Sequence, residues 1–192
     1  MLLKRILRIA VVALVAWAVF SCVLGCKPKV DEPTWDECSN ELGQHPCDFK
    51  MMDQNGKQVN LYDYYGKVIV LDFSAMWCGP CMIAAMDADE VVKKFGEDNV
   101  VYITVLIENS SGDAPIQKNL EDWAEAFGIE INPVLAGSRE WLSESNYHLE
   151  AWPTFYFISS KMIIKEYQRG YSKFNVEGAV QRLLPQNTDT GE

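Results

Sequence analysis

The chain has 192 residues, of which 48% are hydrophobic and 23% are charged, and its formal net charge at pH 7 is −10. This composition is that of an ordinary folded protein, and the length suits one domain that buries its own core. The negative charge argues against nucleic acid as a partner, because phosphates attract lysine and arginine and no basic stripe is present.

The first predicted element is a secretory signal over residues 1–25. Basic residues precede the uncharged apolar stretch IAVVALVAWAVF, and small residues follow it. The ending VLGC resembles a bacterial lipobox, so Cys26 is predicted to carry lipid and to become the N-terminus after cleavage. An uncleaved membrane anchor and plain secretion are the alternatives. All three place the folded part outside the cytoplasm, and the lipid attaches it to a bacterial membrane on the periplasmic side.

The rest of the chain divides into three parts. Residues 26–37 are predicted to be a tether, because prolines and charged residues come before any apolar period begins. The folded domain is predicted over residues 38–184. Residues 185–192, PQNTDTGE, are predicted to be a disordered tail.

Within the domain, apolar periodicity predicts alternating strands and helices. Asn55-Gly56 separates two short alternating stretches and predicts a hairpin with strands near residues 48–52 and 57–60. Longer or later strands are predicted at 67–75, 99–108, TFYFIS and MIIKEYQRG, with a short one in INPVLAG. Helices are predicted at 80–95, 115–127 and 173–184, with a helical turn in SREWLSES. This order predicts an α/β domain with a central mixed sheet covered on both faces.

Two cysteines near the start of the domain predict a structural disulfide. Spare cysteines usually pair in an oxidising compartment, and Cys38 and Cys47 would close the short loop CSNELGQHPC. A zinc site that joins them to Cys78, Cys81 and His45 is the alternative, but C-x8-C is a poor spacing for zinc. We therefore expect no metal. Haem attachment is excluded because methionine, not histidine, follows the C-x-x-C pair.

The pair Cys78 and Cys81, in SAMWCGPCMIAA, predicts a redox dithiol at the start of a helix. The positive end of a helix stabilises a thiolate and lowers the pKa of Cys78. Cys78 would attack a substrate disulfide, and the shielded Cys81 would then resolve the mixed disulfide. Cys81 must lose a proton in that step, and Asp72 on the preceding strand is the predicted acceptor, with a pKa raised by burial. Alternatively, the Asp72 side chain points outward from a strand edge.

Two motifs in the right order resemble the thioredoxin family. VLDFSAMWCGPC resembles the active-site segment of thioredoxin, and HLEAWPTFYFI resembles the second signature, in which a cis-proline precedes a threonine and a strand. The resemblance implies a thioredoxin-like three-layer α/β/α sandwich with Pro153 beside the disulfide. It also matches Gly170 to the glycine before the closing helix. The residues that it implies for substrate binding are Trp77, Gly79, Pro80, Trp152, Pro153 and Thr154.

The surrounding order is similar to the extracytoplasmic redoxins of the TlpA/ResA type over residues 47–184. The similarity rests on the N-terminal hairpin and on an extra helix and strand inserted before the proline. It implies a thiol–disulfide oxidoreductase that needs no cofactor and acts on protein disulfides or thiols. The Gly-Pro dipeptide resembles that of reducing thioredoxins, so we expect reduction or isomerisation, with electrons supplied by a membrane protein.

Three positions depart from the family pattern. Ser74 stands where thioredoxins carry tryptophan, Met86 where they carry a helix-kinking proline, and Ala84 where TlpA-like proteins often carry glutamate. The buried lysine that partners the thioredoxin aspartate has no match. A copper-handling lipoprotein without turnover is the alternative function, since sulfur ligands favour Cu(I), although copper-delivering relatives use C-x-x-x-C. A peroxiredoxin needs serine or threonine three residues before its reactive cysteine, whereas Ser74 lies four before Cys78.

Overall fold

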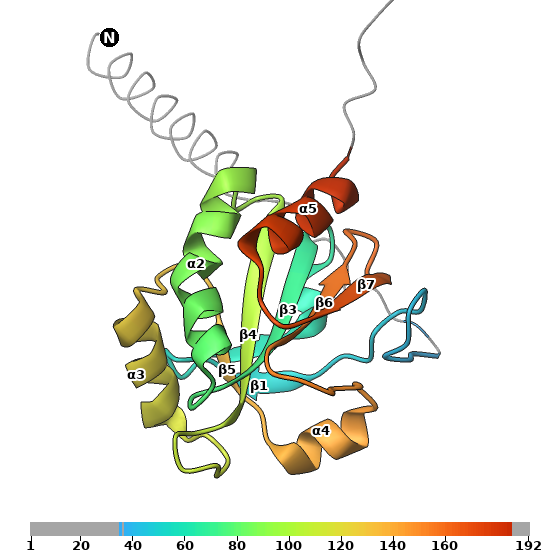
Figure 1. Cartoon of the computed structure of the whole chain (residues 1–192). Coiled ribbons are helices and arrows are strands. Elements are labelled where there is room, and N and C mark those ends of the chain that lie inside the picture. Colours follow the sequence, from blue (N-terminus) through green and yellow to red (C-terminus); the bar gives the residue numbers. More distant parts are fainter. Residues whose placement is uncertain (1–34, 36, 186–192) are drawn as a thin grey trace, which may run out of the picture. The chain divides into compact units, whose positions relative to one another are not determined.

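The computed structural model describes residue 35 and residues 37–185 (Figure 1). The predicted signal, Cys26 and most of the predicted tether lie outside the described residues, and so do residues 186–192. In the part of the chain that is described, no helix is both long enough and apolar enough to cross a bilayer.

The domain is built on a five-stranded mixed sheet with the strand order β5-β4-β3-β6-β7, and a separate two-stranded hairpin precedes it (Figure 1). The elements in chain order are β1 (Lys50–Met52), β2 (Gln58–Asn60), η1 (Leu61–Tyr64), β3 (Val68–Ala75), α2 (Gly79–Phe95), β4 (Val100–Glu108), α3 (Gln117–Phe127), β5 (Val134–Ala136), α4 (Arg139–Ser145), β6 (Thr154–Ile158), β7 (Ile164–Arg169) and α5 (Lys173–Leu183). The thioredoxin-like sandwich expected from the sequence is confirmed.

Strand β3 forms the centre of the sheet, and all eight of its residues are buried. It pairs in parallel with β4, starting with Val68 opposite Val100, and antiparallel with β6 on its other side. A strand with neighbours on both sides and layers on both faces is expected to be continuously apolar. The one charged residue in this strand, Asp72, therefore stands out as a functional candidate.

The two faces of the sheet are covered by different kinds of structure. Val68 and Val70 of β3 pack in one apolar cluster with alanines and valines of α2 and α5. On the opposite face, Ile69, Leu71 and Phe73 pack against the hairpin, η1, and side chains of α4. Because side chains alternate along a strand, Asp72 lies on the α2 face of the sheet.

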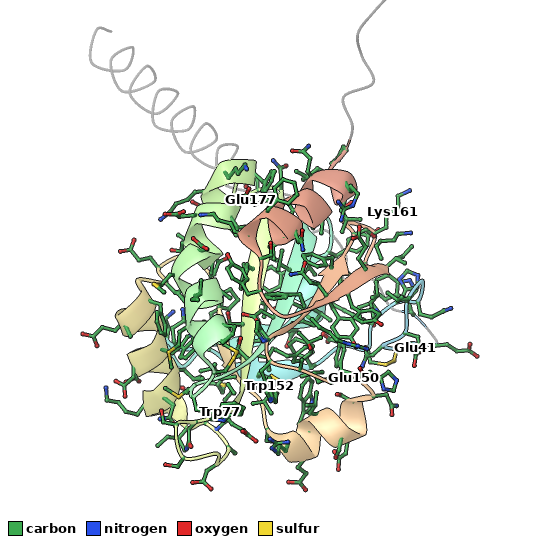
Figure 2. All side chains as sticks on the ribbon, in the orientation of Figure 1. Glu41, Trp77, Glu150, Trp152, Lys161 and Glu177 are labelled. Atoms are coloured by element: carbon green, nitrogen blue, oxygen red, sulfur yellow. A yellow bond between two sulfur atoms is a disulfide. The ribbon has the colours of Figure 1, made fainter. Side chains whose placement is uncertain are left out.

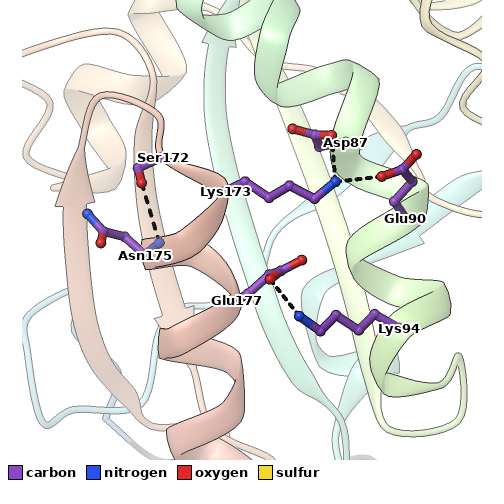
Figure 3. Close-up of polar contacts among 7 residues, drawn as sticks. All are labelled: Asp87, Glu90, Lys94, Ser172, Lys173, Asn175 and Glu177. Carbon is purple, nitrogen blue, oxygen red and sulfur yellow. Dashed lines mark hydrogen bonds and ion pairs between the residues drawn. The ribbon is translucent and has the colours of Figure 1, made fainter.

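Polar contacts hold α5 beside α2 (Figure 3). Lys173 donates to Asp87 at 2.8 Å and also pairs with Glu90, while Lys94 donates to Glu177 at 2.6 Å. Exposed ion pairs of this kind contribute at most about 1 kcal/mol each, so the apolar cluster beneath them supplies most of the stability.

Of the two ends of helix α3, the sequence predicted the C-terminal one correctly and placed the N-terminal one too early. Helix α3 ends at Phe127, as predicted, because Gly128 takes the left-handed conformation (φ 66°) that closes a helix. Its start was predicted at Pro115, but the helix begins at Gln117. The Asn119 side chain accepts the backbone N–H of Ile116 at 3.0 Å, and this local bond fixes the start two residues later. The short helix η1 was not predicted.

Candidate active site

The turn after β3 places Cys78 at the N-terminus of α2. The backbone N–H of Cys78 donates to Ala75 O at 3.1 Å, and Cys78 is the N-cap of the 17-residue helix. Its sulfur accepts the backbone N–H of Cys81 at 3.2 Å. Gly79 and Pro80 form the first helical positions, where the missing N–H of proline costs no hydrogen bond. The sulfur of Cys78 therefore lies in the electrostatic field of a helix N-terminus.

Cys78 and Cys81 form a disulfide that is almost fully covered. Cys78 retains 4% of its surface and Cys81 none. Both pack in one apolar cluster with Leu120 and Trp123 of α3. Cys78 is therefore the residue of the pair that a partner thiol can still reach.

Two tryptophans lie next to each other at the end of the molecule where α2 begins (Figure 2). The rings of Trp77 and Trp152 are 6.4 Å apart and edge-on, and Trp77 is 47% exposed. The peptide bond between Trp152 and Pro153 is cis, and Pro153 is buried. Thr154 is fully buried and donates its hydroxyl to Ala151 O at 2.7 Å. Its side chain therefore supports the proline loop from inside.

Asp72 is completely buried on the central strand, so its side chain does not point outward from a strand edge. Its Oδ1 accepts the hydroxyl of Ser74 at 2.8 Å, and its Oδ2 accepts the hydroxyl of Tyr102 at 3.1 Å. Burial raises the pKa of Asp72 to about 7, although hydrogen bonds from Ser74, Tyr102 and Thr104 act in the opposite direction. A carboxyl group with such a pKa can exchange a proton near neutral pH.

Sequence reasoning missed Glu108, the last residue of β4. Glu108 is 4% exposed, and its carboxylate accepts the indole N–H of Trp77 at 2.7 Å and pairs with the guanidinium of Arg139 at the start of α4. Burial alone would raise the pKa of Glu108, but the hydrogen bonds from Arg139 and Trp77 outweigh it and lower the pKa. The only sequence signal was a charge at the end of an otherwise apolar strand.

Cys38 and Cys47 form the second disulfide, with their Cα atoms 4.9 Å apart. The loop between them is held on the edge of β7, where Gly43 N donates to Ile164 O at 2.8 Å and Ile164 N donates to Gln44 O at 3.0 Å. The four cysteines of the domain therefore lie in two pairs. Among the described residues, no cluster of three or more histidine, cysteine or acidic side chains is arranged to hold a metal.

Helix α2 runs from Gly79 to Phe95 as one element, although methionine replaces the helix-kinking proline at position 86. Met86 is 54% exposed, and Ile83, one turn before it, is 52% exposed. Apolar side chains therefore extend from the dithiol along the outer face of the helix.

Comparisons with known proteins agree with this geometry. A family model described as "AhpC/TSA family" matches residues 42–167. The chain is 26% identical to thioredoxin-like protein YneN of Bacillus subtilis over 134 residues, which are 70% of this chain and 75% of that protein. It is also 26% identical to thiol-disulfide oxidoreductase ResA of Geobacillus thermodenitrificans over 145 residues, 75% of this chain and 79% of the other.

Two solved structures show the same architecture. The exposed lipoprotein thioredoxin Etrx1 of Streptococcus pneumoniae superposes with a TM-score of 0.56 at 28% identity, covering 71% of this chain and 96% of that one. A structure described as a putative thiol:disulfide interchange protein DsbE from Chlorobium tepidum gives a TM-score of 0.60 at 22% identity, covering 74% and 94%. The second likeness concerns the fold alone.

Proposed function

This chain belongs to the AhpC/TSA family and is a thiol–disulfide oxidoreductase, and we propose that it reduces or isomerises protein disulfides outside the cytoplasm. One observation carries the proposal: a C-x-x-C disulfide caps the N-terminus of a long helix, with the sulfur of Cys78 accepting a helix N–H at 3.2 Å. That environment stabilises a thiolate, which is the form of cysteine that attacks disulfides.

In the first step, the Cys78 thiolate of the reduced protein attacks one sulfur of a substrate disulfide. A new S–S bond forms between Cys78 and the substrate, the substrate disulfide breaks, and its electron pair leaves on the second substrate sulfur. Cys78 is suited to this role because, of the pair, it alone keeps exposed surface.

In the second step, Cys81 gives up its proton and attacks the sulfur of Cys78. The Cys78–Cys81 bond forms, the mixed disulfide breaks, and the substrate leaves with its electron pair as a thiolate. Because Cys81 has no exposed surface, bulk water cannot take its proton directly. We assign that proton to Asp72, whose pKa of about 7 and position on the face covered by α2 suit an internal acceptor.

Substrate contact is assigned to the exposed surface around Cys78. Trp77, Gly79 and Pro80 approach from the dithiol loop, and Trp152 with the cis-proline loop approaches from the other side. Thr154 serves from beneath, by holding that loop to Ala151. The exposed Ile83 and Met86 continue this surface and suit a protein substrate better than a small polar one.

The proposed location rests on the N-terminal sequence and on the second disulfide. The signal over residues 1–25 and the lipobox at Cys26 direct the chain across a membrane and attach it there. A Cys38–Cys47 disulfide distant from the redox pair in the sequence suits an oxidising compartment. A reductase in that compartment needs a membrane protein as its electron donor. No cofactor is needed, because both electrons reside in the dithiol.

The reduction potential of Cys78–Cys81 tests the direction of electron flow. Equilibration of the full chain with glutathione buffers should give a value near that of a reducing dithiol, about −270 mV, together with reduction of a protein disulfide at catalytic concentrations. A value near about −120 mV, that of a strong oxidant, would overturn the reductase assignment. Stoichiometric Cu(I) binding by the dithiol without turnover would favour the copper-handling alternative.

A further inference from the structure

We propose that Ser74 and Tyr102 are positioning residues that hold the Asp72 carboxyl group in both of its protonation states, through a hydroxyl cage made of Ser74, Tyr102 and Thr104. The proposal deepens the function above, since it rests on Asp72 as the proton acceptor of Cys81. It concerns how a buried carboxyl group can accept and release a proton without a charged partner.

Both oxygens of the Asp72 carboxylate have a hydroxyl donor in the cage. Each Asp72 oxygen accepts one hydroxyl, from Ser74 at 2.8 Å and from Tyr102 at 3.1 Å. Thr104 lies directly opposite Asp72 in the pairing of β3 with β4 and contributes a third hydroxyl. Ser74, Tyr102 and Thr104 are all at most 1% exposed. Among the described residues, the groups that hydrogen-bond to Asp72 are therefore hydroxyls, with no ammonium or guanidinium group.

Hydroxyl groups differ from charged donors in one respect that matters here. Each can donate one hydrogen bond and accept others, whereas an ammonium or guanidinium group can only donate. When Asp72 is ionised, Ser74 and Tyr102 both donate to it. When Asp72 is protonated, the new O–H can donate to Ser74 Oγ or to the Tyr102 oxygen after that hydroxyl has rotated. The cage therefore supplies a hydrogen-bond partner in either state, which a buried polar group requires.

In the resolving step, the proton that leaves Cys81 is taken up by Asp72. The S–H bond of Cys81 breaks, an O–H bond forms on Asp72, and the electron pair left on Cys81 attacks Cys78 Sγ. The substrate leaves as a thiolate and takes up a proton in solvent. When the Cys78–Cys81 disulfide is reduced again, Asp72 returns its proton to the Cys81 thiolate. One carboxyl group can therefore serve both the oxidation and the reduction of the dithiol.

Other titratable groups on this face come from three elements. Tyr102 lies on β4. The groups whose charges act on it, besides Asp72, are Tyr171, which precedes α5, and Asp87 on α2. Asp87 accepts hydrogen bonds from Tyr171 at 2.6 Å and from Lys173 at 2.8 Å, which ties its charge to a cation at the surface. Strand β6 places Phe155 opposite Asp72 and adds no charge.

The test is a ¹³C NMR titration of the Asp72 carboxyl carbon in the reduced full chain, assigned by its loss in Asp72→Asn. In Ser74→Ala and in Tyr102→Phe, each form of Asp72 loses one hydrogen bond, but the bond to the ionised form is charge-assisted and roughly twice as strong. The titration midpoint should therefore rise by about one pH unit, a tenfold change in proton affinity. The pH profile of kcat/KM for disulfide reduction should move the same way. Ser74→Thr, which keeps a hydroxyl, should restore the parent midpoint.

Tyr147→Phe is the matched control, because the Tyr147 hydroxyl is buried and has no hydrogen-bond partner among the described residues. It should leave the midpoint unchanged. An unchanged midpoint in Ser74→Ala and Tyr102→Phe, or an equal rise in Tyr147→Phe, would overturn the proposal. The titration needs no turnover, so a protein that failed to reduce disulfides would refute the proposed function and still give a clear result for the cage.

Discussion

The two disulfides of this domain differ in exposure, and the more exposed pair is not the one to which we assign the redox role. Cys38 is exposed and Cys47 is half-buried, whereas Cys78 and Cys81 are buried. If access alone set reactivity, the first pair would be the redox pair. We infer the opposite, because a disulfide exchanges quickly when one of its thiolates is stabilised and its neighbour can lose a proton.

The surroundings of the two pairs explain the difference. Cys78 caps a 17-residue helix, its sulfur accepts the backbone N–H of Cys81, and Asp72 lies buried on the sheet face beneath that helix. Cys38 and Cys47 close a loop that lies outside any helix and is held by hydrogen bonds to Ile164 at the edge of β7. One bond is therefore surrounded by groups that stabilise charge, and the other by groups that hold a loop.

The strongest test of this comparison removes a sulfur from each pair. Cys78→Ser should lower the rate of protein-disulfide reduction by at least about 1000-fold, because serine cannot form the mixed disulfide. The variant with both Cys38→Ala and Cys47→Ala should keep the parent rate. Insulin turbidity or a fluorescent protein-disulfide assay measures both. Equal losses in the two variants would mean that the pairs do not divide the roles as argued.

Asp72→Asn should have the next largest effect on turnover. Loss of an internal proton acceptor should slow the resolving step by about 100-fold, and the mixed disulfide should accumulate. The loss should be greatest above about pH 7, where the parent Asp72, with a pKa of about 7, is ionised and can accept a proton, and it should shrink at lower pH, where Asp72 is already protonated. Rapid acid quenching followed by mass spectrometry detects the trapped intermediate. A variant that resolves it at the parent rate would exclude Asp72 as the acceptor.

The same substitution should raise stability at high pH. Burial raises the pKa of Asp72 from 3.8 to about 7, so the folded state binds the proton more tightly than the unfolded chain. Stability from this group is therefore lost as pH rises from about 4 to about 7, by about 4 kcal/mol in total. Urea unfolding of Asp72→Asn should show a gain over the parent at pH 8 that vanishes below pH 4. If the parent were as stable as Asp72→Asn at pH 8, the raised pKa of Asp72 would be contradicted.

The sequence predicted the parts of this site that are local. The apolar run of β3, the C-x-x-C pair at the start of a helix, and the cis-proline signature each lie within a dozen residues, and together they predicted the fold. The hydroxyl of Tyr102 lies 30 residues from Asp72, and the pairing of β3 with β4 brings the two together. That register is a property of the folded sheet, so no local pattern could reveal it.

Glu108 was hidden for the same reason. The register of β3 on β4 shifts between Ser74 and Ala75, which places Ala75 opposite Glu108 and brings the carboxylate to Trp77. Its other partner, Arg139, comes from a separate helix. A contact among three elements depends on an irregularity in strand pairing, and sequence spacing carries no record of it.

Glu108→Gln should give a smaller effect, confined to substrate binding. The change removes the charge that holds Trp77 and Arg139, so the exposed indole should lose its fixed position beside Trp152. We expect KM to rise about tenfold with kcat little changed, the effect of one lost charge-assisted hydrogen bond. Lys118→Gln, which breaks the exposed pair with Asp122 on α3, is the control and should change neither constant. A fall in kcat alone would place Glu108 in the chemistry instead.

Graded reduction compares the two disulfides directly, and no change in activity is expected in this last test. Because the Cys78 sulfur lies at a helix N-terminus, whereas Cys38 and Cys47 lie in a loop, limiting dithiothreitol should open the Cys78–Cys81 pair first, and mass spectrometry after alkylation should find labelled Cys78 before labelled Cys38. Removing the Cys38–Cys47 crosslink should lower the free energy of unfolding by about 2.5 kcal/mol, the chain-entropy value for so short a loop, with turnover unchanged. If the exposed pair opened first, access would govern exchange, and the helix N-terminus would not be the feature that distinguishes the two bonds.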